Sequence, residues 1–278
     1  MTSLTPVLAI VAGLLGLAVG SFLNLVAVRV PAGIPVIQGG RCPRCGSAIA
    51  ARYRAPVLGR LMVRGRCTHC GEPVPLRYPL VEAFTGVAFA AVVWFFLAVF
   101  TDTSWARMPV AVPLVLIAYL YFAAISIVLT LIDLDTHRLP NAIVLPSYPV
   151  AIGLLTLAAL FSADWPALLR AGIGMAILYA FYFLLRLIRP GGMGGGDVKL
   201  AGIIGLYLGW IGWGALAVGA FFAFFYGGVF GIGLMIARRA GRKTAIPFGP
   251  WMILGAWSGI FVGEGIAAAY LRMYTGGQ

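Results

Sequence analysis

Charged residues are scarce in this 278-residue chain, and acidic residues are the scarcest of them. Only 10% of the residues are charged, and Asp and Glu together number 8. Soluble domains carry about a quarter charged residues and are near half apolar, whereas 62% of this chain is hydrophobic. This composition excludes a soluble globular enzyme, a disordered tail, a collagen and a disulfide-rich secreted module. A polytopic membrane protein remains.

Long apolar runs fill most of the chain. A helix that crosses a bilayer needs about 20 mainly apolar residues. Candidate runs lie at residues 5–28, 80–101, 110–132, 140–161, 167–188, 198–212, 213–236 and 250–271. Trp210, Gly212 and Gly214 allow a tight turn between the sixth and seventh runs, where one long broken helix is the alternative. We therefore expect an all-α membrane protein with about eight transmembrane helices. Its parts would be a first helix over 1–28, a loop domain over 29–79 and a multi-helix membrane domain over 80–278.

Basic residues outnumber acidic ones by 20 to 8, which gives a net charge of +12. Seventeen of these 20 cations fall in the segments 29–79, 133–139, 186–199 and 237–243, which alternating spans place on one side of the membrane. By the positive-inside rule that side is cytosolic and the N-terminus lies outside. We expect the basic side to contact anionic lipid headgroups. No nucleic-acid partner is expected, because these cations have no recognition fold around them.

All four cysteines fall in the 29–79 segment, as Cys42-Pro43-Arg44-Cys45 and Cys67-Thr68-His69-Cys70. Two Cys-x-x-Cys pairs with 21 residues between them have the spacing of a four-thiolate zinc site. Four thiolates complete a tetrahedral zinc and leave no open position, so the metal would be structural. The alternatives are two disulfides, a redox pair or another metal. Disulfides need an oxidising compartment, which conflicts with a cytosolic loop.

Three acidic residues stand at predicted cytosolic ends of spans: Asp133, Asp135 and Asp197. Ionisable groups at membrane depth are costly and therefore mark functional sites. Two carboxylates that face each other in a partly dry site share one proton, so that one activates water and the other polarises a carbonyl. The alternatives are a solvated loop for the acids and a flexible turn for the glycines before Asp197. Glu264, inside the last run, is either a buried functional acid or a residue at a helix end near the interface.

The ordered set of motifs resembles the type IV prepilin peptidase family, also called leader peptidase/N-methyltransferase. The first span carries Gly20-Ser21-Phe22-Leu23-Asn24, followed by Arg29-Val30-Pro31. Both cysteine pairs match, as do Arg77-Tyr78-Pro79-Leu80-Val81-Glu82 and Ile132-Asp133 ahead of Leu139-Pro140. The remaining matches are Gly194-Gly195-Gly196-Asp197-Val198-Lys199-Leu200 and Ile246-Pro247-Phe248-Gly249-Pro250.

The resemblance implies an intramembrane aspartic protease of the Gly-x-Gly-Asp type in the bacterial inner membrane. Such enzymes cut the basic leader from type IV prepilins or type II secretion pseudopilins at the cytosolic face. Many also methylate the new N-terminal amine with S-adenosylmethionine. The matching catalytic positions are Asp133 and Asp197, and the zinc ligands are Cys42, Cys45, Cys67 and Cys70. The methyltransferase function is associated with the loop that contains Gly65 and with the motif that ends at Glu82.

The chain departs from the family pattern at two places. Residues 54–59 replace the Asn-Ile-Pro segment of many members, which bears on methyl transfer more than on cleavage, and Asn141 stands where many members have Asp. Two other classes of protein would also explain the features taken singly. One is a membrane transporter with a zinc-stapled loop, and the other is a non-catalytic pilus assembly factor.

Overall fold

The structure is a computed structural model that describes residues 4–36, 42, 44–48, 56, 59, 62, 65–73, 75–99, 110–189, 193–237 and 247–275. Most of the departing stretch 54–59 and of the basic segment 237–243 lies outside these residues. The described part is helical and contains no strand, which confirms the predicted all-α class. A β-bridge joins Arg66 and Pro73 in the cysteine loop.

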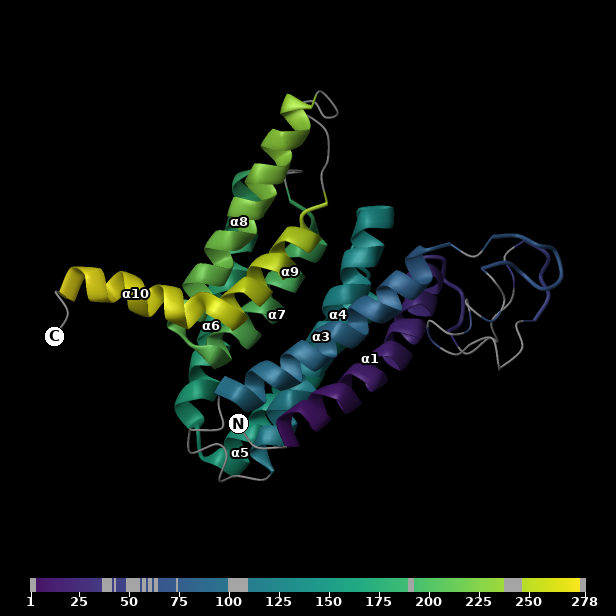
Figure 1. Ribbon diagram of the computed structural model, residues 1–278. Helices are drawn as coiled ribbons and strands as arrows, with labels where there is room; N and C mark the ends of the chain where they lie inside the picture. Colours follow the sequence, from purple (N-terminus) through teal and green to yellow (C-terminus); the bar gives the residue numbers. More distant parts are fainter. Residues whose placement is uncertain are drawn as a thin grey trace. The chain divides into compact units, whose positions relative to one another are not determined.

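The helices follow the predicted apolar runs closely (Figure 1). They are α1 (Leu4–Arg29), α3 (Arg77–Val99), α4 (Ala111–Thr136), α5 (Asn141–Ser162), α6 (Trp165–Ile188), α7 (Gly195–Ile211) and α8 (Trp213–Ile236), then α9 (Gly249–Ser258), a π-helical stretch η3 (Gly259–Gly263) and α10 (Glu264–Thr275). Seven helical stretches are long and apolar enough to cross a membrane, with α9, η3 and α10 counted together as the last. The expected number was about eight, and the difference is α7.

Helix α7 has 17 residues, which at about 1.5 Å per residue span about 25 Å. Apart from Lys199, every residue from Val198 to Trp210 is buried. A helix that is apolar on all sides can face lipid or occupy the centre of a bundle. Here α7 takes the centre, in contact with α5, α6, α8 and α9. The predicted turn is confirmed, because Gly212 is the one residue between α7 and α8.

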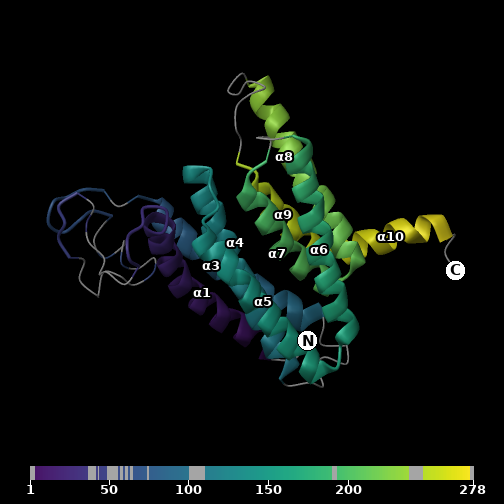
Figure 2. The same ribbon diagram turned by 180° about the vertical axis from the view of Figure 1, so that it is seen from behind.

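Contacts divide the chain into two compact units. The first is Met1–Ala106 with Tyr119–Val128, and the second is Arg107–Ala118 with Leu129–Gln278. In the first unit α1 lies along α3 (Figures 1 and 2). Gly16 and Gly20 permit this approach, since a Cβ on Gly16 would lie 2.7 Å from the Thr85 carbonyl oxygen and one on Gly20 would lie 2.7 Å from the Glu82 Cα. Small residues at a helix interface are typical of membrane bundles.

The second unit is held by the same device along two seams. On the α6–α7 seam, a Cβ on Gly205 would overlap the Gly174 carbonyl. On the α8–α9 seam, Gly255, Gly259 and Gly263 recur every four residues, and they face Ala215, Gly219 and Ala223 of α8. These contacts fix α7 and α9 in register with their neighbours. They thereby fix the two helix starts that bear on the site described next.

The far end of α7 is closed by a side chain of α6. The Arg170 guanidinium donates from Nε to the Gly209 carbonyl at 2.7 Å and from one terminal nitrogen to the Trp210 carbonyl at 2.8 Å. The last carbonyls of a helix have no partner within the helix and carry partial negative charge. A cation at this point satisfies both needs. Arg170 therefore explains how α7 can end inside the bundle.

Candidate functional site

Asp133 lies in the last turn of α4 and is 4% exposed. Its Oδ2 accepts a hydrogen bond of 3.0 Å from the backbone N–H of Gly249, the first residue of α9. A Cβ on Gly249 would lie 2.7 Å from that oxygen, so only glycine lets the amide come so close. Asp133 thus lies in the last turn of α4, and its carboxyl faces the first residue of α9. A helix start is a place where unpaired amides favour an anion.

Asp197 is the third residue of α7 and is half-buried. Its Oδ2 accepts a 3.0 Å hydrogen bond from the backbone N–H of Gly194, which immediately precedes the helix. An acid at the third helical position that reaches back to the N-cap amide is a capping-box arrangement. The glycine run therefore does more than bend. It brings its own backbone amide to the Asp197 carboxylate.

The two carboxyls, 64 positions apart in sequence, come within electrostatic range of each other and repel when both are ionised. Leu139, just after α4, fills the space between their helix starts. Its Cβ would lie 2.8 Å from a Cβ on Gly196, and its Cδ2 would lie 3.6 Å from one on Gly249. Among the described residues, neither Oδ1 of the two acids accepts a hydrogen bond. Each acid thus has one oxygen tied to a helix-start amide and the other available to water or substrate.

An aromatic cluster covers the site from α6 and α8. The Tyr182 ring is 2% exposed and its centroid lies 5.5 Å from that of Phe224 and 6.3 Å from that of Phe248. Its hydroxyl lies within electrostatic range of Asp197. Phe248 directly precedes the amide that binds Asp133, so one cluster touches the surroundings of both acids. The sequence gives no signal for Tyr182, which is one aromatic in a run of several.

Helix α5 holds the first turn of α7 through two polar contacts. Lys199 Nζ donates to Asn141 Oδ1 at 2.9 Å, and the Tyr148 hydroxyl donates to the Lys199 carbonyl at 2.6 Å. Gly202 leaves the room that the Tyr148 hydroxyl needs. The departure at position 141 therefore replaces a carboxylate with an amide beside Lys199. The hydrogen bond survives this change, although its acceptor carries no charge.

One neighbouring helix, α8, extends past the level of the acid pair. A Cβ on Gly227 of α8 would lie 2.8 Å from the Phe248 ring, which places the start of α9 level with Gly227. The α8 helix continues to Ile236, nine residues further, or about 14 Å. This extension carries exposed apolar side chains such as Val229 and Ile232. The start of α9, which binds Asp133, therefore lies about two and a half helical turns short of the end of α8.

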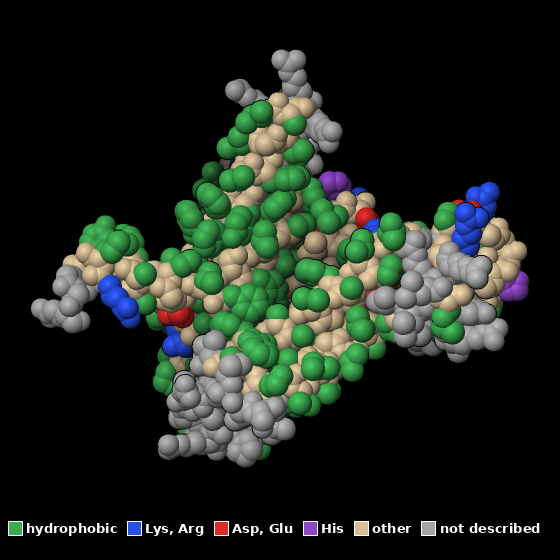
Figure 3. Space-filling model, viewed as in Figure 1, with side chains coloured by type: hydrophobic (Ala, Val, Ile, Leu, Met, Phe, Trp, Pro, Cys, Tyr) green, Lys and Arg blue, Asp and Glu red, His purple; other side chains and the backbone are tan. Residues whose placement is uncertain are grey.

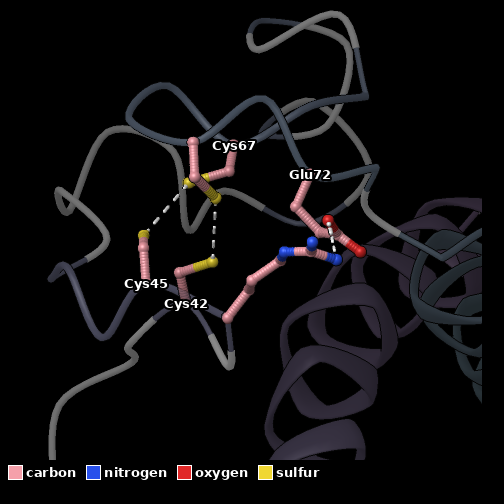
Figure 4. Close-up of polar contacts among 6 residues, drawn as sticks. Cys42, Cys45, Cys67 and Glu72 are labelled. Atoms are coloured by element: carbon pink, nitrogen blue, oxygen red, sulfur yellow. Dashed lines mark hydrogen bonds and ion pairs between the residues drawn. The ribbon is translucent and has the colours of Figure 1, made fainter.

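The four cysteines come together in the first unit (Figure 4). All four sulfurs lie within 4.8 Å of one another, with Cys42 and Cys70 at 3.8 Å and Cys45 and Cys67 at 4.0 Å. Ligands about 2.3 Å from a tetrahedral zinc stand about 3.8 Å apart. The donor set and its spacing therefore fit a tetrahedral metal ion. All four cysteines are free thiols, so the structure does not have the two disulfides that were the alternative.

Each cysteine pair forms the same local turn. Gly46 and Gly71 take φ of 69° and 71°, and their amides donate to the carbonyls of Cys42 and Cys67 at 2.9 and 3.0 Å. Glycine adopts this left-handed conformation without strain, which explains its place after each pair. An ion pair of 3.0 Å between Arg44 and Glu72 joins the two turns (Figure 4).

The turns also favour the thiolates that a metal needs. The backbone amides of Cys70 and His69 lower the pKa of the Cys67 thiol to about 6. The Ser47 hydroxyl and amide lower the pKa of Cys45. The amide of Glu72 favours the Cys70 thiolate as well, yet desolvation and the other three thiols outweigh it and raise its pKa to about 12. Four thiolates so close together need a cation among them.

The other predicted residues lie on separate elements. Gly65 takes a φ of 70° just before the second cysteine turn, and Glu82 is buried in α3 beside Gly20 of α1. Asp135 is exposed at the end of α4. Glu264 lies where η3 passes into α10, and its Oε1 accepts a 2.9 Å hydrogen bond from the Ala215 amide in the first turn of α8. It is exposed, so it is not the buried functional acid that was one of its two predicted alternatives.

Comparisons with known proteins match both units of the chain. Residues 14–96 match the family described as the bacterial peptidase A24 N-terminal domain, and residues 120–236 match the type IV leader peptidase family. A prepilin leader peptidase/N-methyltransferase of Stutzerimonas stutzeri is 31% identical over 93% of this chain and 92% of its own length. Proteins of the same name from Neisseria gonorrhoeae and Bacillus subtilis are 31% and 27% identical and are covered over 91% and 97% of their lengths. No solved structure matches the chain.

Proposed function

This chain belongs to the type IV leader peptidase family, and from that premise we propose that it cleaves the leader from type IV prepilins or type II secretion pseudopilins and methylates the new N-terminal amine. The observation that carries the peptidase assignment is the pair Asp133 and Asp197. Two acids from separate helices lie within electrostatic range of each other. Each accepts a hydrogen bond from a helix-start amide with one oxygen and keeps the other oxygen available. A transporter would not need two acids that are each bound by a helix-start amide, and nothing favours that alternative.

We assign hydrolysis to the pair as follows. Since two close carboxyls do not both ionise, one carries a proton and the other is a carboxylate. The carboxylate takes a proton from water while the water oxygen attacks the scissile carbonyl carbon. The protonated acid gives its proton to the carbonyl oxygen, which yields a tetrahedral diol. The C–N bond then breaks, the leaving amine receives a proton from one carboxyl, and a diol hydroxyl returns its proton to the other.

The glycine amides have a defined part in this scheme. The amides of Gly249 and Gly194 hold one oxygen of each acid, which restricts the rotamers of both side chains and leaves the other oxygen of each for water or substrate. Preorganised groups of this kind lower the barrier because they need no rearrangement during the reaction. The part of α8 beyond Gly227 extends past the pair, and its apolar side chains would limit the access of bulk water from that side.

We propose that the protein is a multi-pass inner-membrane protein whose acid pair and cysteine loop face the cytosol. The support is the distribution of the cations, since 17 of 20 fall in segments assigned to one side. The same cations would contact anionic headgroups. The basic leader of a substrate would be repelled by the Arg-rich loop. We therefore expect the leader to be held by lipid headgroups and acids.

Zinc is the metal that we assign to Cys42, Cys45, Cys67 and Cys70, where it would staple a loop too small to hold itself together by a core. We place methyl transfer in the first unit, with Gly65 and Glu82 on the side of S-adenosylmethionine. The φ of 70° at Gly65 favours a residue without a side chain, in keeping with close approach of a cofactor. S-adenosylmethionine supplies the methyl group that the new amine accepts.

One experiment tests the whole proposal. The purified chain is incubated with a prepilin and S-adenosylmethionine, and the product is weighed by mass spectrometry. Leader loss with a gain of about 14 Da, one CH₂, is expected. Asp133→Asn and Asp197→Asn should each abolish cleavage, whereas the exposed Asp135→Asn serves as the matched control. Cleavage that survives either active-site change would refute the assignment, and cleavage without the mass gain would leave a peptidase alone.

A further inference from the structure

Helix α10 is the least packed helix of the second unit. It follows directly on the five-residue π-helical stretch η3 and turns away from the line of α9 (Figures 1 and 2). Its side chains from Ala268 to Tyr274 are all exposed. By length and composition alone, Gly249–Tyr274 is one candidate membrane span of 26 residues, and the apolar run 250–271 predicts the same. The bend requires another account of residues 264–275.

The chain has already crossed the bundle where α10 begins. The α9–η3 stretch runs along α8 toward its first residue, and a Cβ on Gly263 would lie 2.7 Å from the Ala215 Cα. The next residue, Glu264, caps the first turn of α8 by accepting from the Ala215 amide. The 24 residues of α8 span about 36 Å, enough for the hydrocarbon core of about 30 Å. Residues after 264 therefore lie beyond the end of α8 that is remote from the aspartates.

The sequence of α10 is amphipathic. Ile266, Tyr270, Met273 and Tyr274 recur at intervals of three and four and share one face, which is the spacing of an apolar helical stripe. Glu264, Arg272 and Thr275 fall on the opposite face by the same periodicity. Figure 3 shows hydrophobic side chains along one side of this helix and a basic side chain on the other. The Tyr270 hydroxyl donates a hydrogen bond of 3.3 Å to the Tyr274 hydroxyl.

We propose that α10 lies in the membrane–water interface of the leaflet remote from Asp133 and Asp197, with its tyrosine stripe in the lipid. Three observations lead to a lipid occupant. The apolar stripe is exposed, its two tyrosines belong to a residue type enriched at membrane interfaces, and Arg272 falls on the opposite face, where it would meet phosphates and water. Glu264 holds the bend by tying the first residue of α10 to α8. The inference rests on the second unit spanning a membrane and does not depend on catalysis.

The test measures where single positions of α10 lie in a bilayer. A nitroxide is attached through an oxime to p-acetylphenylalanine placed at Tyr270, Tyr274, Ala268 or Arg272, which leaves the four cysteines untouched. The full-length protein is reconstituted into vesicles of phosphatidylethanolamine and phosphatidylglycerol. Power-saturation spectroscopy then compares collision with oxygen, which concentrates in lipid, with collision with a soluble nickel chelate. We expect oxygen to dominate at positions 270 and 274 and the chelate to dominate at positions 268 and 272.

Every other pattern overturns the proposal. Oxygen dominance at all four positions would mean one continuous transmembrane helix, and chelate dominance at all four would mean a helix in water. Spin–spin broadening at position 270 that disappears on dilution with unlabelled protein would mean that a second copy covers the stripe. Leader cleavage measured on the same vesicles keeps this outcome separate from the proposed function, since labels at α10 should leave cleavage unchanged.

Discussion

Replacing Gly249 by alanine tests how much the acid pair depends on its helix-start amide. The new Cβ would lie 2.7 Å from Asp133 Oδ2 and 3.6 Å from the Leu139 side chain, so the amide and the carboxyl have to move apart. That movement breaks the 3.0 Å hydrogen bond to the carboxyl. A hydrogen bond to a charged group contributes about 1.5–3 kcal/mol. At about 1.4 kcal/mol per factor of ten, we expect kcat for leader cleavage to fall about 10- to 150-fold.

The same substitution should leave the fold and substrate binding intact. Position 249 begins α9, where alanine is a better helix former than glycine by about 1 kcal/mol, so propensity does not oppose the change. The assay is single-turnover cleavage of a prepilin together with thermal unfolding in detergent. Gly228→Ala is the matched control, because a Cβ there meets no other atom within 4 Å. Full kcat in Gly249→Ala, or an equal loss in Gly228→Ala, would refute the role of the amide.

Three further predictions concern the helices and the cysteine loop. Tyr148→Phe removes one hydrogen bond to the first turn of α7, worth about 1 kcal/mol, so kcat should fall about fivefold with KM unchanged in initial-rate measurements. Cys67→Ser should lose the bound metal ion while His69→Ala keeps it, as measured by elemental analysis of the purified protein; equal metal content in both would contradict the four-thiolate site. Gly205→Ala places a Cβ on a backbone carbonyl of α6 and should lower the unfolding temperature by several degrees. Gly172→Ala in α6 is the control, because a Cβ there meets no other atom within 4 Å and the unfolding temperature should not fall. Equal unfolding temperatures of the two variants would argue against close α6–α7 packing.

Much of the fold follows from local sequence. The spans are predicted because a membrane requires long apolar runs, and the turn at Gly212 because a short link between apolar runs needs glycine. The cysteine turns depend on residues within a few positions of each other, so Gly46 and Gly71 already mark them. These features need no knowledge of which helix packs against which.

What escaped prediction depends on contacts across the fold. An all-apolar run does not say whether it faces lipid or the bundle centre, so the central position of α7 does not follow from its sequence. The break before α10 has no proline to mark it; Glu264 sets it by bonding to α8, 49 positions earlier. Gly249 belongs to the motif Ile246-Pro247-Phe248-Gly249-Pro250, yet nothing in the sequence places its amide against Asp133, 116 positions away.

The central place of α7 has a consequence for biogenesis. This helix carries Asp197, is short for a bilayer and is buried by its neighbours from Leu200 to Trp210, so its position depends on the helices that surround it. It is joined to α8 through the single residue Gly212, and its packing partners α8 and α9 are made after it. The contacts around Asp133 and Asp197 can therefore be completed only when synthesis has passed α9. A truncated or partly inserted chain that lacks α9 would lack the amide that binds Asp133, and we expect it to have no protease activity.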